Sequence, residues 1–421
     1  MNIAIVSYKG MSKNPGERMI DKIHSVNNWS QAIFLSAFFG LALALPLAEA
    51  LKQISVILII LLGIHLIFKK ELNIEENLLT YSAIGLVLSS LISAFFAFNT
   101  TEALKACIDI FRIIMIFLII KTISLNINQL IIFNKILFFS MIVALLYGLY
   151  QFHFFPNPSP DEITYLELHS IGHVNHSSIY LLLVFTIALT WLFCRDNRFP
   201  DISIGFLLFI IIGSLAGIFI TGSRATMFTS LLLILLIFLL FFITKQYRNT
   251  KLLVILAILT IIPLMVLFSS EYSLERLLWG FNMIHRDALM EASIRAWLEH
   301  NIFFGIGADN SHYINPQDYD VESVFPAIPH AHNTYITYLL ERGLFGFSLY
   351  IIFIFSVLIA LLKQYAKTKD RLVTAGLLIW LVNFLISLVN TTFHDENALL
   401  MVLIWGLALN QYLGSTIQKV K

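Results

Sequence analysis

The feature that most constrains this chain is the recurrence, along almost its whole length, of apolar runs close to membrane-spanning length. A helix needs roughly 20 apolar residues to cross the hydrocarbon core of a bilayer. Hydrophobic residues make up 58% of the chain and charged residues 13%, whereas soluble domains have about half and about a quarter. We therefore predict an all-α polytopic membrane protein with about twelve transmembrane helices. The runs lie at about residues 31–50, 52–68, 78–98, 107–124, 130–152, 177–194, 202–222, 225–244, 252–270, 344–363, 372–391 and 398–414.

Basic residues indicate how these spans are oriented. No small-residue cleavage site convincingly follows the first run, so we expect an uncleaved first span behind a polar tail at residues 1–30. Loop lysines and arginines gather on the side of this tail, which makes that side cytoplasmic and places both termini there, with a short tail at 415–421. They are Lys9, Lys13, Arg18, Lys22, Lys69, Lys70, Lys121, Arg195, Arg198, Lys245, Arg248, Lys251, Lys363, Lys367, Lys369, Arg371, Lys419 and Lys421.

Two connections on the opposite side are long, and long ordered loops often carry function. The first covers about residues 151–176, within the nine spans of 31–270. The second, at 271–332, precedes the last three spans in 333–414. Inside it, His285–Asn301 has apolar and charged residues at helical spacing, which predicts an amphipathic helix on the membrane surface.

A compact motif follows this second loop, where the chain returns to the apolar pattern. His332 and Asn333 are followed by nine residues, Gly343, two residues and Gly346. The nine residues have helical spacing, so we predict a helix that starts at His332 and ends at the glycines. A histidine would thereby be held where a helix meets the membrane surface.

Arginines on the non-cytoplasmic side are exceptions to the positive-inside rule. Arg224 lies in a short turn between two apolar runs, and a bound anion would offset the cost of a cation there. Guanidinium groups suit phosphates, so two arginines could clamp a pyrophosphate, and we select Arg224 and Arg295. The alternatives are that Arg224 touches lipid headgroups and that Arg295 is the polar side of a surface helix. Arg276, Arg286 and Arg342 are predicted as ordinary interfacial charges, with Arg286 kept as a secondary candidate.

His332 is the strongest candidate for acid–base chemistry. Imidazole is partly neutral near pH 7, so His332 could act as a general base on an acceptor hydroxyl. It could equally be protonated and hold phosphate, or be a packing or capping histidine. The secondary candidates are Asn333, His330 and Asp395, of which Asp395 could orient a base or pair with an arginine, although solvated loop acids are commoner.

Several other classes of site are disfavoured by the sequence. His169, His173 and His176 are spaced to share a helix face, and Asp318 and Asp320 resemble an acidic metal pair, but a clear ligand set is lacking, so we predict no metal and no cofactor. No phosphate-cradling loop or basic nucleic-acid stripe is present. The span interiors are almost free of carboxylates, which argues against ion-coupled transport. Cys107 and Cys194 lie at opposite faces and should not pair.

These motifs resemble a known family, the bacterial O-antigen ligases, which group with O-antigen polymerases and some protein O-oligosaccharyltransferases. His332-Asn333 through Gly346 reproduces the family's histidine motif. The turn around Arg224 resembles the family's arginine turn, and the segment around Arg295 resembles its arginine in the large periplasmic loop. The resemblance implies a GT-C-type fold in the inner membrane with a large periplasmic loop between helices 9 and 10. It further implies inverting transfer of a glycan from undecaprenyl pyrophosphate to the lipid A core of lipopolysaccharide, on the periplasmic face.

The roles of individual residues follow from the same resemblance. Arg224 and Arg295 would bind the pyrophosphate, and His332 would activate the acceptor hydroxyl, without metal or nucleotide. The alternatives are an O-antigen polymerase or a protein O-oligosaccharyltransferase that uses the same donor. A flippase or exporter of lipid-linked sugars is a hypothesis of another class, disfavoured because transport sites tend to lie near the middle of the membrane.

Overall fold

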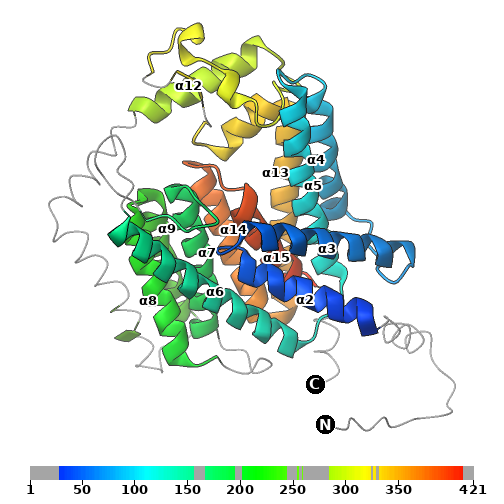
Figure 1. Ribbon diagram of the computed structural model, residues 1–421, viewed down its shortest axis with the longest axis vertical. Helices are drawn as coiled ribbons and strands as arrows, with labels where there is room; N and C mark the ends of the chain where they lie inside the picture. The colour runs from blue at the N-terminus through cyan, green and yellow to red at the C-terminus, as the bar shows by residue number, and fades with distance from the viewer. Residues whose placement is uncertain are drawn as a thin grey trace.

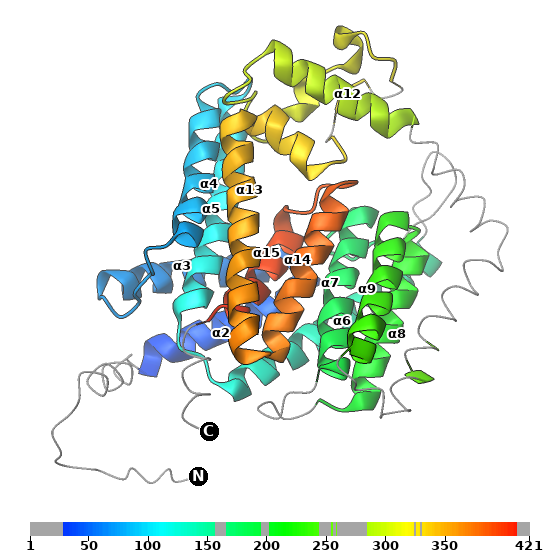
Figure 2. The same ribbon diagram turned by 180° about the vertical axis from the view of Figure 1, so that it is seen from behind.

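The chain folds into a bundle of α-helices with a smaller helical layer across one end (Figures 1 and 2). The computed structural model describes residues 28–155, 166–194, 202–243, 254–255, 258, 284–323, 326–328 and 331–410. Within these ranges the regular elements are α-helices and two short 3₁₀ turns, and no strand occurs. The prediction of an all-α protein is confirmed for this part of the chain.

The helices follow the apolar runs closely. Most of the predicted run at 252–270 lies outside the described residues, so the total of twelve spans stays a prediction. The described elements are α2 (Asn28–Ala44), α3 (Glu49–Phe68), α4 (Leu78–Ala94), α5 (Thr100–Thr122), α6 (Ile127–Phe154), α7 (Val174–Phe193), α8 (Ile204–Thr221), α9 (Arg224–Ile243), α12 (Ile284–Glu299), η2 (Ser311–Tyr313), η3 (Pro316–Tyr319), α13 (Thr334–Thr368), α14 (Arg371–Ser387) and α15 (Asp395–Ala408).

Length and composition agree with a polytopic membrane protein. Five helices, α3, α6, α7, α8 and α13, are long and apolar enough to cross a membrane. Four shorter apolar helices accompany them, and they lie in α2, α4, α9 and α14. Many large apolar side chains on the outer helices remain exposed, for example Phe139 and Ile212, as expected for surfaces that contact lipid.

The bundle is organised around α7. This helix is apolar on every side, and 94% of its membrane-length window is buried, so it behaves as a central helix. It packs against α8, α14 and α15. The opposite half of the bundle is built by α4, α5 and α13, with α13 packed along α4 and α15 packed along α5.

The layer across one end of the bundle consists of α12 and the turns that follow it (Figure 2). We call this the α12 end. Leu289 and Ala292 of α12 are buried in a small cluster with Ile306, Tyr319 and Leu340. The apolar side of α12 therefore packs against its own loop and α13, and not on a membrane surface as the sequence predicted. Periodicity reveals an apolar side, but it does not reveal what covers that side.

Candidate functional site

The first turn of α13 holds the histidine motif. The side chain of Asn333 caps the helix, because its Oδ1 accepts hydrogen bonds from the backbone N–H groups of Tyr335 and Ile336 at 2.9 and 3.1 Å. His332 directly precedes this cap, is half-buried and has a φ of +49°. Positive φ is uncommon for residues other than glycine, and it often marks functional positions. The predicted helix start is confirmed.

The first motif glycine breaks α13. Gly343 has φ 62° and ψ −172°, a combination essentially restricted to glycine, in the middle of an otherwise continuous helical segment. A Cβ at this position would lie 2.3 Å from the carbonyl carbon of Phe303. The predicted end of the short helix at the glycines is confirmed, and close packing against the loop explains why glycine is needed there.

Backbone hydrogen bonds dock the loop segment 302–307 into this break. The N–H groups of Leu344 and Phe345 donate to the carbonyls of Ile302 and Phe303 at 2.8 and 3.1 Å. In return, the N–H groups of residues 306 and 307 donate to the carbonyls of residues 340 and 341 at 3.0 and 2.9 Å. Groups that the break frees from the helix are thereby paired, which satisfies buried backbone. These hydrogen bonds join the loop to α13 at this point.

Arg342 has a structural role that the sequence did not reveal. Its Nη1 lies 3.0 Å from Glu341 Oε2, its Nε donates to Ser90 Oγ at 2.9 Å, and its guanidinium covers the ring of Tyr338 at 4.5 Å. The side chains of Arg342 and Glu341 are both buried. The prediction of an ordinary interfacial charge is therefore wrong, because Arg342 joins α13 to α4 inside the protein.

The loop between α14 and α15, residues 388–394, supports the start of α13. Asn333 Nδ2 donates to the carbonyl of Leu388 at 2.9 Å, and Thr334 Oγ1 donates to the carbonyl of Asn390 at 2.9 Å. From the other side, Arg286 Nη1 donates to the carbonyl of Val389 at 3.3 Å. This 388–394 loop therefore brings α12 and the histidine motif together.

Of the candidate arginines, Arg224 lies near enough to Arg286 for its charge to act on it. Arg224 begins α9, directly after the left-handed Gly222 turn. Burial, followed by the nearby positive charge of Arg224, lowers the pKa of Arg286. Arg224 is exposed and Arg286 is half-buried, and two neighbouring guanidinium groups of like charge would attract an anion.

Arg295 lies elsewhere on α12. It forms an ion pair with Glu291 at 2.5 Å, and its Nη1 donates to the carbonyl of Tyr319 at 2.9 Å. Side chains nine residues apart on an α-helix point about 180° apart, so Arg295 and Arg286 are on opposite sides of α12. The structure thus brings together Arg224 and the secondary candidate Arg286, and it does not bring Arg295 to them.

Asp395 pairs with its neighbour in the chain. His394 Nδ1 lies 2.7 Å from Asp395 Oδ2, and Asp395 has a φ of +42°. Burial alone would lower the pKa of His394, but the hydrogen bond and charge of Asp395 outweigh it and raise the pKa to about 9. The charges of Asp309 and Glu341 act in the same direction. These contacts favour the imidazolium form of His394 at neutral pH.

This pair predicts a pH dependence. The pKa of His394 is about 9 in the folded chain and about 6.5 in an unfolded one. Its stabilising effect is therefore complete below about pH 6.5 and is lost as the pH rises through about 9. NMR of histidine-labelled protein should give this pKa, with the resonance assigned by its absence in His394→Gln. In Asp395→Asn the pKa of His394 should fall, and an unchanged titration would contradict the pairing.

The histidines before and in α7 do not share a helix face. His173 is the residue that caps α7, so His169 lies outside the helix, and only His176 is within it. The rings of His173 and His176 lie 5.8 Å apart, and His176 lies 5.7 Å from His394. In the described part of the chain, no three His, Cys, Asp or Glu side chains are arranged to hold a metal ion. His330 and Arg276 lie outside the described residues.

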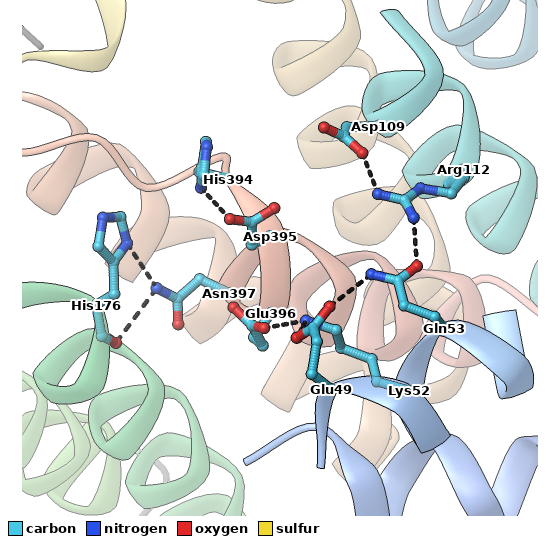
Figure 3. A network of polar contacts seen from close by, with 10 residues as sticks. All are labelled: Glu49, Lys52, Gln53, Asp109, Arg112, His176, His394, Asp395, Glu396 and Asn397. Carbon is cyan, nitrogen blue, oxygen red and sulfur yellow. Dashed lines mark hydrogen bonds and ion pairs between the residues drawn. The ribbon is translucent and has the colours of Figure 1, made fainter. Parts of the chain in front are cut away.

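Sequence reasoning missed a polar network between α3, α5 and α15 (Figure 3). Lys52 of α3 forms a buried ion pair with Glu396 of α15 and a second with Glu49. On α5, Arg112 pairs with Asp109. Glu49 and Glu396 lie in the first turns of α3 and α15, so of these carboxylates only Asp109 is an exception to the prediction that the span interiors are almost free of carboxylates. The residues lie far apart in the sequence, so no local pattern could have grouped them.

Comparison with known proteins agrees with the motifs. Residues 206–351 match a family model described as O-antigen ligase. The matched segment runs from α8 to α13 and contains Arg224, Arg286, Arg295, His332 and both motif glycines. No curated protein matches the chain. The resemblance predicted from the histidine and arginine motifs is confirmed for residues 206–351, which are similar to the O-antigen ligase family.

Proposed function

We propose that this protein is a glycosyltransferase of the inner membrane that moves a glycan from undecaprenyl pyrophosphate to the lipid A core of lipopolysaccharide. The α12 end would face the periplasm, where both substrates carry their sugars. The observation that carries the proposal is that Arg286 and the His332-Asn333 helix start meet at the 388–394 loop, with the charge of Arg224 acting on Arg286. No metal or cofactor is part of the proposal.

Arg224 and Arg286 would hold the donor pyrophosphate. Paired guanidinium groups donate several hydrogen bonds to phosphate oxygens and stabilise the negative charge that develops on the leaving group. This assignment replaces Arg295 with Arg286, because Arg286 lies beside Arg224 and contacts the loop that also supports His332. The ion pair of Arg295 with Glu291 instead fits a role in holding α12 to its loop.

His332 would accept the proton of the acceptor hydroxyl. The acceptor oxygen then forms a bond to the anomeric carbon of the donor sugar as the bond from that carbon to the phosphate oxygen breaks. Undecaprenyl pyrophosphate leaves, and attack from the opposite side inverts the anomeric centre. The Asn333 side chain caps the helix and donates a hydrogen bond to the carbonyl of Leu388, and these bonds would hold the neighbouring His332 in position.

If Arg224 and Arg286 bind the pyrophosphate and Arg295 does not, alanine substitutions of these three arginines should differ in their effect on the rate of transfer. Arg224→Ala and Arg286→Ala should each lower the rate of transfer by about 10²–10³, because each removes a donor to the charged leaving group. Arg295→Ala is the matched control on the same helix and should stay within about threefold of the native rate. The measurement is transfer by purified protein, with monodispersity in detergent as the folding control. A large loss in Arg295→Ala alone would overturn the assignment.

The acceptor that receives the glycan distinguishes the ligase reaction from those of an O-antigen polymerase and a protein O-oligosaccharyltransferase. The same donor is offered together with lipid A core, with a second lipid-linked glycan or with an acceptor protein. Product on lipid A core supports the ligase, whereas longer lipid-linked glycan identifies an O-antigen polymerase. Glycan on the protein would identify a protein O-oligosaccharyltransferase.

A further inference from the structure

Aromatic side chains gather on the outer surface of the protein, where α4 ends and α13 passes its break. Phe95 at the end of α4 is 79% exposed, and Phe303 in the turn after α12 is 64% exposed. The ring centroids of Phe96 and Phe304 lie 4.8 Å apart in a stacked pair, and those of Phe304 and Phe345 lie 6.1 Å apart. We call this group the aromatic patch. It is formed by Phe95, Phe96, Phe303, Phe304, Leu344 and Phe345, which come from three separate segments of the chain.

Hydrogen bonds hold the turn that presents Phe303 at the surface. Asn301 Oδ1 accepts hydrogen bonds from the backbone N–H groups of Phe303 and Phe304 at 3.2 and 3.0 Å. The carbonyl of Ile302 accepts a hydrogen bond from Trp297 Nε1 of α12 at 3.0 Å. The exposed phenyl ring therefore belongs to a turn that is hydrogen-bonded on both sides. A contiguous apolar patch of this kind usually marks a contact surface.

The length of α13 relates the aromatic patch to the bilayer. This helix is one of the five that are long and apolar enough to cross a membrane. After the break it runs from Leu344 to Lys363, an exposed lysine near the end that the distribution of basic residues predicts to be cytoplasmic. These roughly 20 residues extend over roughly 30 Å, which is the thickness of the hydrocarbon core. Leu344 and Phe345 are therefore expected at the opposite boundary of that core.

Hydrogen bonds bring the turn to the same height as the start of this span. The N–H groups of residues 344 and 345 donate to the carbonyls of Ile302 and Phe303 at 2.8 and 3.1 Å. The apolar helix α4, which packs along α13, reaches this level as well. Its 17 residues extend over roughly 26 Å and end directly before Phe95. The turn after α12 and the ends of two apolar helices therefore meet at one level of the membrane.

The chemistry of the aromatic patch fits lipid acyl chains. All six of its side chains are apolar. Away from the α12 end, the outer surfaces of both helices continue with exposed apolar side chains, such as Leu88 and Leu91 on α4 and Ile352 and Phe355 on α13. Tryptophan and tyrosine favour the headgroup level, where their polar atoms are solvated, whereas phenylalanine has no polar side-chain atom. The boundary of the hydrocarbon core therefore suits these rings.

We propose that the aromatic patch is a lipid-binding surface, through which residues 302–304 of the large loop enter the acyl-chain boundary of the bilayer. Contact with the membrane was expected of α12, and it belongs instead to the turn that follows α12. The inference rests on the membrane-spanning character of the helices and does not depend on the proposed reaction. Because Trp297 of α12 and the backbone of α13 are both bonded to this turn, its insertion would set the height of α12 and Arg286 relative to the membrane.

The first experiment measures what surrounds the aromatic patch. In a chain with Cys107→Ala and Cys194→Ser, a nitroxide is attached to a single cysteine introduced as Phe303→Cys, and the protein is placed in lipid nanodiscs. Molecular oxygen concentrates in hydrocarbon and a nickel chelate stays in water, so their effects on the relaxation of the nitroxide report its surroundings. Oxygen should be several-fold more effective than the nickel chelate at Phe303→Cys. At the matched control Glu299→Cys, which is exposed on α12 four residues earlier, the nickel chelate should be more effective.

Two outcomes of this experiment would overturn the proposal. One is a nickel chelate that is more effective than oxygen at Phe303→Cys. The other is a nitroxide that neither reagent reaches, which would mean that protein covers the patch, either a second copy or another part of this chain. Phe95→Cys repeats the measurement from α4 in case the turn does not tolerate substitution, and monodispersity in detergent is the folding control.

The second experiment measures the depth of the aromatic patch. A fluorophore on Phe303→Cys is quenched by lipids that carry a nitroxide in the headgroup, near the carbonyl end of an acyl chain or near its middle. Quenching should be strongest for the lipid labelled near the carbonyl end. Ile212→Cys, which is exposed halfway along α8, should be quenched most by the lipid labelled near the middle. Strongest quenching of Phe303→Cys by the headgroup label would overturn the proposal, and the result needs no transfer assay.

Discussion

Replacing Gly343 by alanine is expected to lower the free energy of unfolding by about 3 kcal/mol or more and to abolish transfer. The added Cβ would meet the backbone of Phe303 at 2.3 Å, and the φ and ψ angles at this position are ones that alanine avoids. The chain can relieve this collision only by undocking segment 302–307 from α13. Thermal unfolding of purified protein in detergent measures the loss.

A second glycine with positive φ serves as a control that separates the effect of the steric collision at Gly343 from the effect of its backbone conformation. Gly172 also has positive φ, at +71°, but a Cβ there would meet nothing within 4 Å. Gly172→Ala should therefore cost only about 1 kcal/mol, the usual penalty for the backbone alone. Equal destabilisation by the two substitutions would show that docking of the loop contributes little at Gly343.

Replacing His332 by alanine should lower transfer by about 10²–10⁴, the range for loss of a general base. Because His332 has positive φ, alanine also changes the backbone preference, and it cannot test the imidazole alone. Asparagine tolerates this conformation better than other residues that have a side chain. His332→Asn should therefore fold like the native chain and still lack activity, as measured by transfer from undecaprenyl-pyrophosphate glycan.

The alternatives give different results with the same pair of variants. If the residue matters only for its backbone conformation, His332→Asn will keep activity and His332→Ala will lose it. If the protein exports lipid-linked sugars, both variants will still move the donor across the membrane. Accumulation of unused donor in cells that carry either variant would favour the transferase.

The sequence predicted those features that depend on neighbouring residues. Apolar runs located the helices, because a helix surrounded by lipid or by other helices must be apolar over its whole length. The cap at Asn333 and the break at Gly343 were equally predictable, since capping and glycine preferences act within one turn. The elements on either side of the motif were therefore placed correctly before any contact was known.

Features that depend on the rotation of one element against another could not be predicted. The choice between Arg286 and Arg295 is decided by which side of α12 faces the 388–394 loop, and that loop is about 100 residues further along the chain. The ion pair of Lys52 with Glu396 joins residues 344 positions apart. Composition shows only that charged residues are few. The packing of α3, α5 and α15 is what brings these charged residues together.

The break in α13 also explains why the number of residues between Asn333 and Gly343 matters. Asn333 caps the helix and Gly343 is held against segment 302–307, so the nine residues between them form a spacer with both ends fixed. At about 1.5 Å per residue the spacer is roughly 14 Å long, and it makes two and a half turns. One residue more or fewer would change the height only slightly, but it would rotate His332 by about 100° relative to the 388–394 loop. The spacing of the motif therefore determines the direction in which His332 points more than the distance between the two ends of the motif.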